Sequence, residues 1–300
     1  MRFLFVILLF ISTFKSFAGA TSWFAFELEG GHIKVPIKVA GIDGYAILDT
    51  GSQVNSINKS FIAKNELSLL KSKKIKVQGV FGVQNTQTYK DVPIEFFGMK
   101  TKMSGLTEAV LGYHTNSILL GASFFNKFIV QLDYPNEKMR LITRDSIDLT
   151  KFKNIDIKSQ KGTGMPIVKV GLGDDRYMWL FLDTGNSGGM VVERKVASRN
   201  GWLKEAEVES NISMGANTFA ITESFRIPQL SFGPYNLENV LVTIPAEGQK
   251  TYLESQYQYS GSRIRGRKVE GLIGYDVLKH FLITIDYKEG LAHIGLPEEK

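Results

Sequence analysis

A tripeptide that occurs twice is the feature that most constrains how this chain can fold. Asp-Thr-Gly stands at positions 49–51 and again at 183–185, 134 residues later, and each copy ends a short apolar run. Such runs are typical of buried strands. An acid placed directly after a buried strand lies at the floor of a cavity, and the glycine allows a sharp turn there. Two copies in this setting predict a duplicated structural unit.

The surroundings of the two motifs repeat as well, which extends the duplication along the chain. Each motif is preceded by a second apolar segment, at 35–39 and at 165–170. Each is followed by an apolar-apolar-Gly element, at 119–121 and 272–274, and then by an apolar segment that ends in Asp-Tyr, at 133–134 and 286–287. The chain therefore looks like one fold written twice.

Paired Asp-Thr-Gly motifs, each followed by apolar-apolar-Gly, resemble the aspartic proteases of the pepsin and retropepsin type. The sequence of each half most resembles the bacterial retropepsin-like domains, and the presence of both halves in one chain resembles pepsin. The resemblance covers roughly residues 30–296 and is specific at the two motifs and the two apolar-apolar-Gly elements. It implies an all-β fold, a two-lobed pepsin-like double β-barrel with a few short helices and an internal pseudo-two-fold repeat.

The same resemblance implies an aspartic endopeptidase in which Asp49 and Asp183 are catalytic. Two carboxylates at hydrogen-bond distance cannot both ionise comfortably, so the pair would hold one proton. The ionised member would take a proton from water, and the protonated member would donate one to the scissile carbonyl oxygen. This mechanism needs no covalent intermediate, no cofactor and no metal. The substrate would be a peptide or protein.

The resemblance also assigns supporting roles to the rest of both motifs. We expect Thr50 and Thr184 to hold the two loops together by hydrogen bonds across the pseudo-two-fold axis. Gly51 and Gly185 would allow the close approach that this geometry requires.

A glycine-bearing segment at 77–83, followed by 89–94, predicts a hairpin at the place of the family's flap. No tyrosine occupies an obvious flap position, so Phe81 and Gly82 are the candidate substrate-binding residues there. Phe81 is equally compatible with a place in the core. Residues 214–218 mark a turn where a second flap-like hairpin could stand.

The amino-terminal residues 1–20 predict a cleaved signal peptide. Arg2 precedes an apolar stretch at 3–14, and Ala18-Gly19-Ala20 fits a cleavage site before Thr21. The apolar stretch falls short of the ~20 residues that span a bilayer. We therefore expect an exported protein, periplasmic or secreted.

The remaining organisation follows from local patterns. We expect an N-terminal lobe at 24–143, an inter-lobe connection at 144–162 and a C-terminal lobe at 163–297, with one strand of a shared sheet near Ile155 and Ile157. The spacing of apolar and turn residues predicts a strand at 33–39, a turn at 42–44, a helix at 60–70 with Ser60 as N-cap, and helices at 122–128 and 196–203.

The second half is longer than the first, and we assign the additional residues to an insertion at 247–270. Three interpretations stay open for this insertion. It could be a mobile surface loop, a loop at the mouth of the cleft that contacts substrate, or a self-processing site at 263–267.

Competing chemistries find little support in the sequence. There is no cysteine, and the four histidines form no metal-binding pair. The formal charge of +6 is scattered apart from a lysine-rich run at 71–76, which suggests an exposed strand edge, so we expect no nucleic-acid partner.

Two rivals to a single-chain enzyme remain. One is a non-catalytic periplasmic peptide-binding module on the same fold. The other is a pair of halves that each dimerise between chains. A single-chain enzyme would be a monomer.

Overall fold

The chain folds mainly into β-strands with five short helices among the residues that the structure describes, which confirms the predicted all-β class. The structure is a computed structural model, and it describes residues 19–160, 164–204, 206–215, 218–249, 251–252 and 267–297. The predicted leader up to residue 18 and residues 263–266 of the predicted self-processing site lie outside these ranges. No helix in the described part of the chain is long and apolar enough to cross a membrane.

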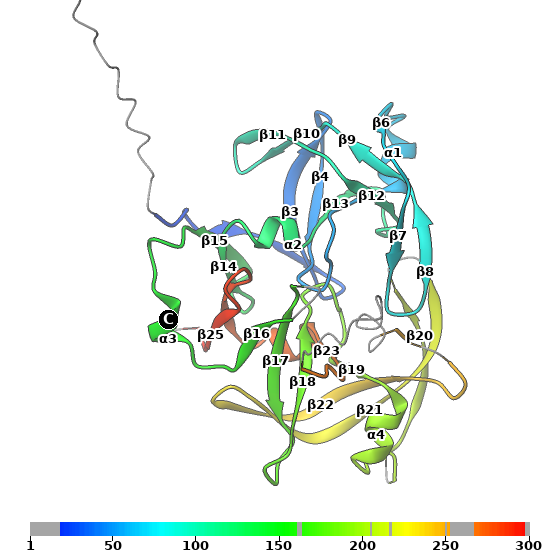
Figure 1. Cartoon of the computed structure of the whole chain (residues 1–300), viewed down its shortest axis with the longest axis vertical. Helices are drawn as coiled ribbons and strands as arrows, with labels where there is room; N and C mark the ends of the chain where they lie inside the picture. Colours follow the sequence, from blue (N-terminus) through cyan, green and yellow to red (C-terminus); the bar gives the residue numbers. More distant parts are fainter. Residues whose placement is uncertain are drawn as a thin grey trace, which may run out of the picture.

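A ten-stranded sheet carries the first motif (Figure 1). Its strand order is β11-β10-β3-β4-β13-β5-β12-β9-β6, with β2 paired to β3. Strand β13 lies parallel to β4 and antiparallel to β5, so it passes between the motif strand and the segment that follows the motif. The strands are β2 (Glu27–Glu29), β3 (His32–Val39), β4 (Ile42–Leu48), β5 (Ser56–Asn58), β6 (Leu70–Lys71), β9 (Thr88–Lys90), β10 (Val92–Phe96), β11 (Met99–Met103), β12 (Leu106–Ala109) and β13 (Asn116–Leu120).

An eight-stranded sheet carries the second motif, in the order β16-β17-β18-β23-β19-β22-β21-β20. Here β23 lies parallel to β18 and antiparallel to β19. The strands are β16 (Ile157–Ser159), β17 (Pro166–Gly171), β18 (Tyr177–Leu182), β19 (Met190–Val192), β20 (Glu209–Met214), β21 (Phe219–Phe232), β22 (Tyr235–Pro245) and β23 (Gly271–Ile273).

A five-stranded sheet joins the two halves, in the order β1-β15-β14-β24-β25. The adjacent strands β14 and β24 come from different halves, and they pair antiparallel from Ile129 opposite Asp286 to Asp133 opposite Leu282. Both carry the repeated Asp-Tyr ending at or just after their last residue. The strands are β1 (Phe24–Ala25), β14 (Ile129–Asp133), β15 (Lys138–Ile142), β24 (Leu282–Asp286) and β25 (Leu291–Gly295).

Residues 155–159 do not join that shared sheet. Strand β16 pairs antiparallel with β17, from Ile157 opposite Val168 to Ser159 opposite Pro166. The expected shared strand near Ile155 and Ile157 is therefore wrong, because this segment forms an edge of the second-half sheet.

The predicted flap is a separate two-stranded hairpin, β7 (Ile75–Gln78) with β8 (Val83–Thr86). It hangs from the first half toward the second-half sheet on the right of Figure 1. The expected partner segment at 89–94 instead contributes β9 and β10 to the ten-stranded sheet. The second hairpin predicted around 214–218 is present, since β20 pairs antiparallel with β21 from Glu209 opposite Ser224 to Met214 opposite Phe219.

The helices are shorter than their apolar spacing predicts. They are α1 (Lys59–Lys64), α2 (Ala122–Phe125), α3 (Leu149–Phe152), α4 (Arg194–Arg199) and α5 (Tyr275–Leu278). The N-cap of α1 is Asn58, whose side chain accepts a hydrogen bond from the Ser60 backbone N–H, so the predicted Ser60 cap is wrong. Glu66 has a φ of 50°, a conformation that a helix cannot continue through.

The turn before the first motif strand also differs from the expected one. Residues 42–44 are the first residues of β4, and the chain reverses at Ala40 and Gly41, which have φ values of 52° and 82°.

Candidate active site

Both motif aspartates lie directly after a buried strand end. Asp49 follows β4, and its backbone N–H donates to the Leu120 carbonyl over 3.0 Å. Asp183 follows β18, and its N–H donates to the Ile273 carbonyl over 2.9 Å. In each half the neighbouring parallel strand, β13 or β23, thus fixes where the motif strand ends and its loop begins.

The threonines of the two motifs bind the loops to each other. The Thr50 hydroxyl donates to the Leu182 carbonyl over 2.6 Å and accepts from the Thr184 N–H over 3.0 Å. The Thr184 hydroxyl donates to the Leu48 carbonyl over 2.9 Å and accepts from the Thr50 N–H over 3.0 Å. Both threonines are fully buried. Four reciprocal hydrogen bonds therefore join segments that lie 134 residues apart in sequence.

The glycines bring each loop close to the opposite carboxyl group. A Cβ atom on Gly51 would lie 2.4 Å from the Asp183 carboxyl carbon, and one on Gly185 would lie 2.3 Å from that of Asp49. No side chain fits at either distance. The structure thus brings the six motif residues of both halves together in one cluster around two facing carboxyl groups.

The two apolar-apolar-Gly elements close behind these loops. Gly121 contacts the first loop, where an added Cβ would lie 2.6 Å from the Ser52 carbonyl oxygen, and the Ala122 N–H donates to that oxygen over 2.8 Å. In the second half, a Cβ on Gly274 would lie 2.3 Å from the Asn186 carbonyl oxygen, and the Tyr275 N–H donates to it over 2.9 Å. Glycine is required at both places because the backbones touch.

Burial and mutual proximity shift the protonation of the two acids. Both side chains keep a partly exposed surface but are densely surrounded by protein, so water reaches them over a limited area. Burial, the charge of Asp183 and a hydrogen bond to Asp183 raise the pKa of Asp49 well above its usual value. Burial also raises the pKa of Asp183, while hydrogen bonds from Asp49 and from the Gly185 N–H (2.9 Å) oppose that shift. One Asp49 oxygen, Oδ1, is buried without a hydrogen-bond partner among the described residues.

The tips of the two hairpins meet. Phe81 and Gly82 lie in the turn between β7 and β8, where the Gly79 N–H donates to the Gly82 carbonyl. A Cβ on Gly82 would lie 2.8 Å from Thr218 Cγ2, and one on Gly215 would lie 2.9 Å from the Phe81 ring. Phe81 is half-buried against this second hairpin and is no part of the hydrophobic core, which settles the choice between hairpin tip and core.

Val80, next in the same turn, reaches the second half. The Tyr252 N–H donates to its carbonyl over 2.7 Å, and its side chain packs on a small cluster that is separate from the main core. This second-half cluster consists of Met165, Ile167, Trp179, Phe181, Val269 and Leu272.

Two tyrosines near the motif loops escaped the sequence reasoning. The Tyr287 hydroxyl donates to the Thr50 carbonyl over 3.3 Å. The Tyr134 hydroxyl is buried without a hydrogen-bond partner among the described residues. Burial raises the pKa of both phenols, with a further contribution from the charge of Asp183. The sequence feature that could have identified these tyrosines is the repeated Asp-Tyr pair. It ends the strand that passes beneath the motif loop of the other half.

Acidic and imidazole side chains of the described residues form no group of three that could hold a metal ion.

Comparison with known proteins bears on the second half. A family model described as aspartyl protease matches residues 168–277, a range that includes Asp183, its motif and the second apolar-apolar-Gly element. A search of curated proteins finds no significant match to the chain. The match supports an aspartyl protease family with a protease-type function, and hence peptide or protein substrates.

Proposed function

We propose that this chain is an aspartic endopeptidase that hydrolyses peptide bonds with water activated between Asp49 and Asp183. The observation that carries the proposal is the reciprocal set of hydrogen bonds between Thr50 and Thr184. These bonds fix two carboxyl groups opposite each other, which is the arrangement that a shared proton requires.

We also propose that the fold is the two-lobed, pepsin-like double barrel with a pseudo-two-fold repeat. The order of pairing supports this. Strands β4, β13, β5 and β12 are neighbours in the first half, and β18, β23, β19 and β22 are neighbours with the same parallel and antiparallel senses in the second.

The environments of the two acids suggest which of them holds the shared proton. Asp183 accepts a hydrogen bond from the Gly185 N–H, which favours its ionised form. Asp49 Oδ1 is buried without a hydrogen-bond partner among the described residues, so this oxygen is free to carry the proton. We therefore assign the proton of the free enzyme to Asp49.

The chemistry follows from this assignment. Asp183 accepts a proton from the attacking water while Asp49 donates its proton to the oxygen of the scissile carbonyl. The product is a neutral tetrahedral intermediate, with no bond between enzyme and substrate. Asp183 then donates its proton to the leaving nitrogen, the C–N bond breaks, and a hydroxyl of the intermediate returns a proton to Asp49 as the product carboxyl group forms. The peptide would lie extended beneath the two hairpins.

The proposal is tested by cleavage of a mixed peptide library from pH 3 to 10, with products read by mass spectrometry. We expect an acid to weakly acid optimum, because activity falls once Asp49 loses the shared proton. Asp49→Asn and Asp183→Asn should each abolish cleavage while their circular dichroism matches the wild type. Near-normal turnover in either variant, or an optimum above pH 8, would remove the dyad from the mechanism.

We further propose that the protein is an exported, periplasmic or secreted monomer. The predicted signal peptide motivates the location, and the two motifs within one chain motivate the monomer. Amino-terminal sequencing of the natively produced protein should begin at Thr21, and light scattering should give the mass of one chain. Retention of Met1, or a dimer mass, would contradict the respective statement.

A further inference from the structure

One face of strand β18 carries a row of aromatic side chains that leads to the candidate active site. Successive side chains of a strand alternate between its faces, so Tyr177, Trp179 and Phe181 lie on one face of β18. Asp183 follows at the same two-residue interval, just after the strand ends. At ~3.3 Å per residue, Trp179 lies about 13 Å along the strand from Asp183. Phe181 and Trp179 both belong to the second-half cluster on which Val80 of the first hairpin packs. The row is therefore on the side of the sheet that the hairpin covers.

Cationic side chains lie over this aromatic row. The Arg267 guanidinium is 4.6 Å from the centre of the Trp179 ring, and the Lys158 ammonium is 5.7 Å from it. Both cations are exposed, and neither forms an ion pair with a described acidic residue. Each attraction to the ring is worth about a kcal/mol or less at an exposed site, so it positions the charges without neutralising them.

The indole N–H of Trp179 strengthens the case for a ligand at this place. The side chain is 6% exposed, and its Nε1 has no acceptor among the described residues. A buried donor without a partner is costly, and a carboxylate oxygen would satisfy it.

The corresponding place in the first half has the opposite character. Tyr45 lies four residues before Asp49, as Trp179 lies four before Asp183. Its hydroxyl donates to a Glu27 carboxylate oxygen over 2.9 Å. The ammonium of Lys34, 5.1 Å above the Tyr45 ring, forms an ion pair with Glu29. The first half thus presents a neutralised cation and a carboxylate where the second half presents two unpaired cations.

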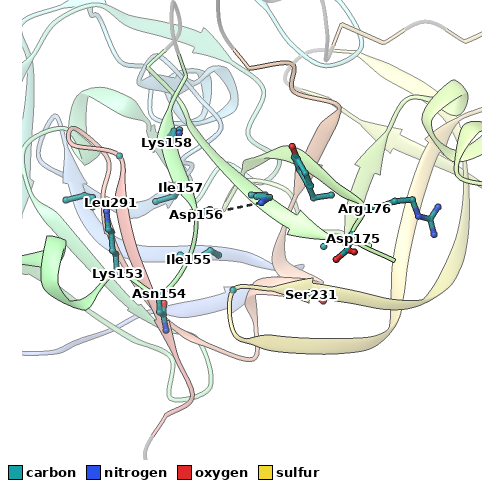
Figure 2. A pocket seen from close by; sticks show the side chains of 15 residues that line it. Lys153, Asn154, Ile155, Asp156, Ile157, Lys158, Asp175, Arg176, Ser231 and Leu291 are labelled. Atoms are coloured by element: carbon teal, nitrogen blue, oxygen red, sulfur yellow. Dashed lines mark ion pairs between the residues drawn. The ribbon is translucent and has the colours of Figure 1, made fainter. Parts of the chain in front are cut away.

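A groove adjoins this cationic surface and shares Lys158 with it (Figure 2). It has a volume of about 870 Å³ and runs along β16 and the far end of β18. Its charged lining consists of Lys153, Lys158, Lys169 and Arg176 against Asp156 and Asp175. The Lys169 ammonium lies 3.8 Å from Asp156 and 4.1 Å from the Tyr177 ring centre. The net charge of the groove is therefore positive.

We propose that Lys158, Arg267 and the Trp179 indole form a distal subsite for a carboxylate of the polypeptide substrate. The proposal rests on the proposed protease function and adds a charge preference on one side of the scissile bond. An acidic residue two to four positions from that bond, on the side bound by the second half, places its carboxylate between the two cations. The first half, with Glu27 at the corresponding place, disfavours an acidic residue on the other side.

The test compares matched peptides that differ only by Glu or Gln at one position, scanned across both sides of a cleaved bond. We expect a preference for Glu in kcat/KM of about tenfold, on one side only, because each of the two exposed ion pairs contributes up to about fivefold. Arg267→Gln and Lys158→Gln should each reduce the preference, and the double variant should abolish it. Lys102→Gln, which removes an exposed cation of β11, should leave the preference intact.

Binding to the Asp183→Asn variant separates this proposal from the protease function. Labelled Glu and Gln peptides are titrated by fluorescence anisotropy, once with an amidated end and once with a free carboxyl end in place of Glu. Tighter binding of the Glu peptide assigns the site to acidic side chains, and tighter binding of the free end assigns it to a chain terminus. Preferred binding without cleavage by the wild type would overturn the protease function alone. Equal binding and cleavage of Glu and Gln peptides, or a preference that survives in the double variant, would overturn the subsite alone.

Discussion

Replacing the Thr184 hydroxyl by a methyl group tests whether the reciprocal hydrogen bonds hold the two halves together. Thr184→Val keeps the shape of a fully buried side chain but removes one donor and one acceptor. The Leu48 carbonyl loses its 2.9 Å partner, and the Thr50 N–H loses its 3.0 Å partner. A buried polar group left without a partner costs about 1–3 kcal/mol, so the variant should lose about 2–6 kcal/mol of unfolding free energy. That is a large part of the ~5–15 kcal/mol that folded proteins possess.

Thr184→Ser is the matched control, because it keeps the hydroxyl and loses one methyl group, worth about 1 kcal/mol. Both variants are unfolded in urea and followed by tryptophan fluorescence and circular dichroism. The valine variant should have the clearly lower midpoint. Thr50→Val should lose a similar amount of unfolding free energy, because the Thr50 hydroxyl makes the equivalent two hydrogen bonds. It donates to the Leu182 carbonyl and accepts from the Thr184 N–H. If the valine and serine variants of Thr184 agree within about 0.5 kcal/mol, the hydroxyl does not hold the loops and the reasoning fails.

Two further predictions concern protonation and the buried tyrosines. Asp49→Asn should raise the melting temperature at pH 7, by about 2–4 °C for each kcal/mol recovered. The gain should shrink toward pH 4. The pKa of Asp49 is raised in the folded chain, so its carboxyl group stabilises the fold below the unfolded pKa, and this stabilisation is lost as the pH rises through the folded pKa. A gain that is larger at pH 4 than at pH 7 contradicts this. Tyr287→Phe removes the hydrogen bond to Thr50 and should cost about 1 kcal/mol in urea unfolding. Tyr134→Phe removes a buried hydroxyl without a described partner and should be neutral or stabilising, so the reverse order would refute the assignment.

The residues of the candidate site could be predicted from sequence because they form a short contiguous motif that occurs twice. An acid, a hydroxyl and a glycine after a buried strand leave few other structures, and the repeat removed the ambiguity of a single copy. The second hairpin was predicted for a similar reason, since Gly215 and the residues around it mark a turn.

Other features depend on contacts that local patterns do not contain. The sequence around Ile157 is equally compatible with a strand of either sheet. The pairing of Ile157 with Val168 places this strand in the second-half sheet. The helix expected at 60–70 stops early because Glu66 adopts a positive φ that apolar spacing does not reveal. The turn at Ala40 has the same origin, a positive φ at a residue other than glycine. The role of Tyr287 requires its strand to cross beneath a loop more than 200 positions away.

The pairing of β14 with β24 limits the order in which the chain can fold. The first 150 residues can close the ten-stranded sheet by themselves, but β14 then keeps an unpaired edge until β24 arrives some 150 positions later. Pairing over such separations is slow, and a waiting edge is open to wrong partners. A nascent chain would thus expose this edge until β24 has been synthesised. The Thr50 loop of the candidate active site accepts a hydrogen bond from Tyr287, which lies just after β24, so this support also waits for β24. The synthesis of β24 would thereby complete both the shared sheet and the support of the candidate site.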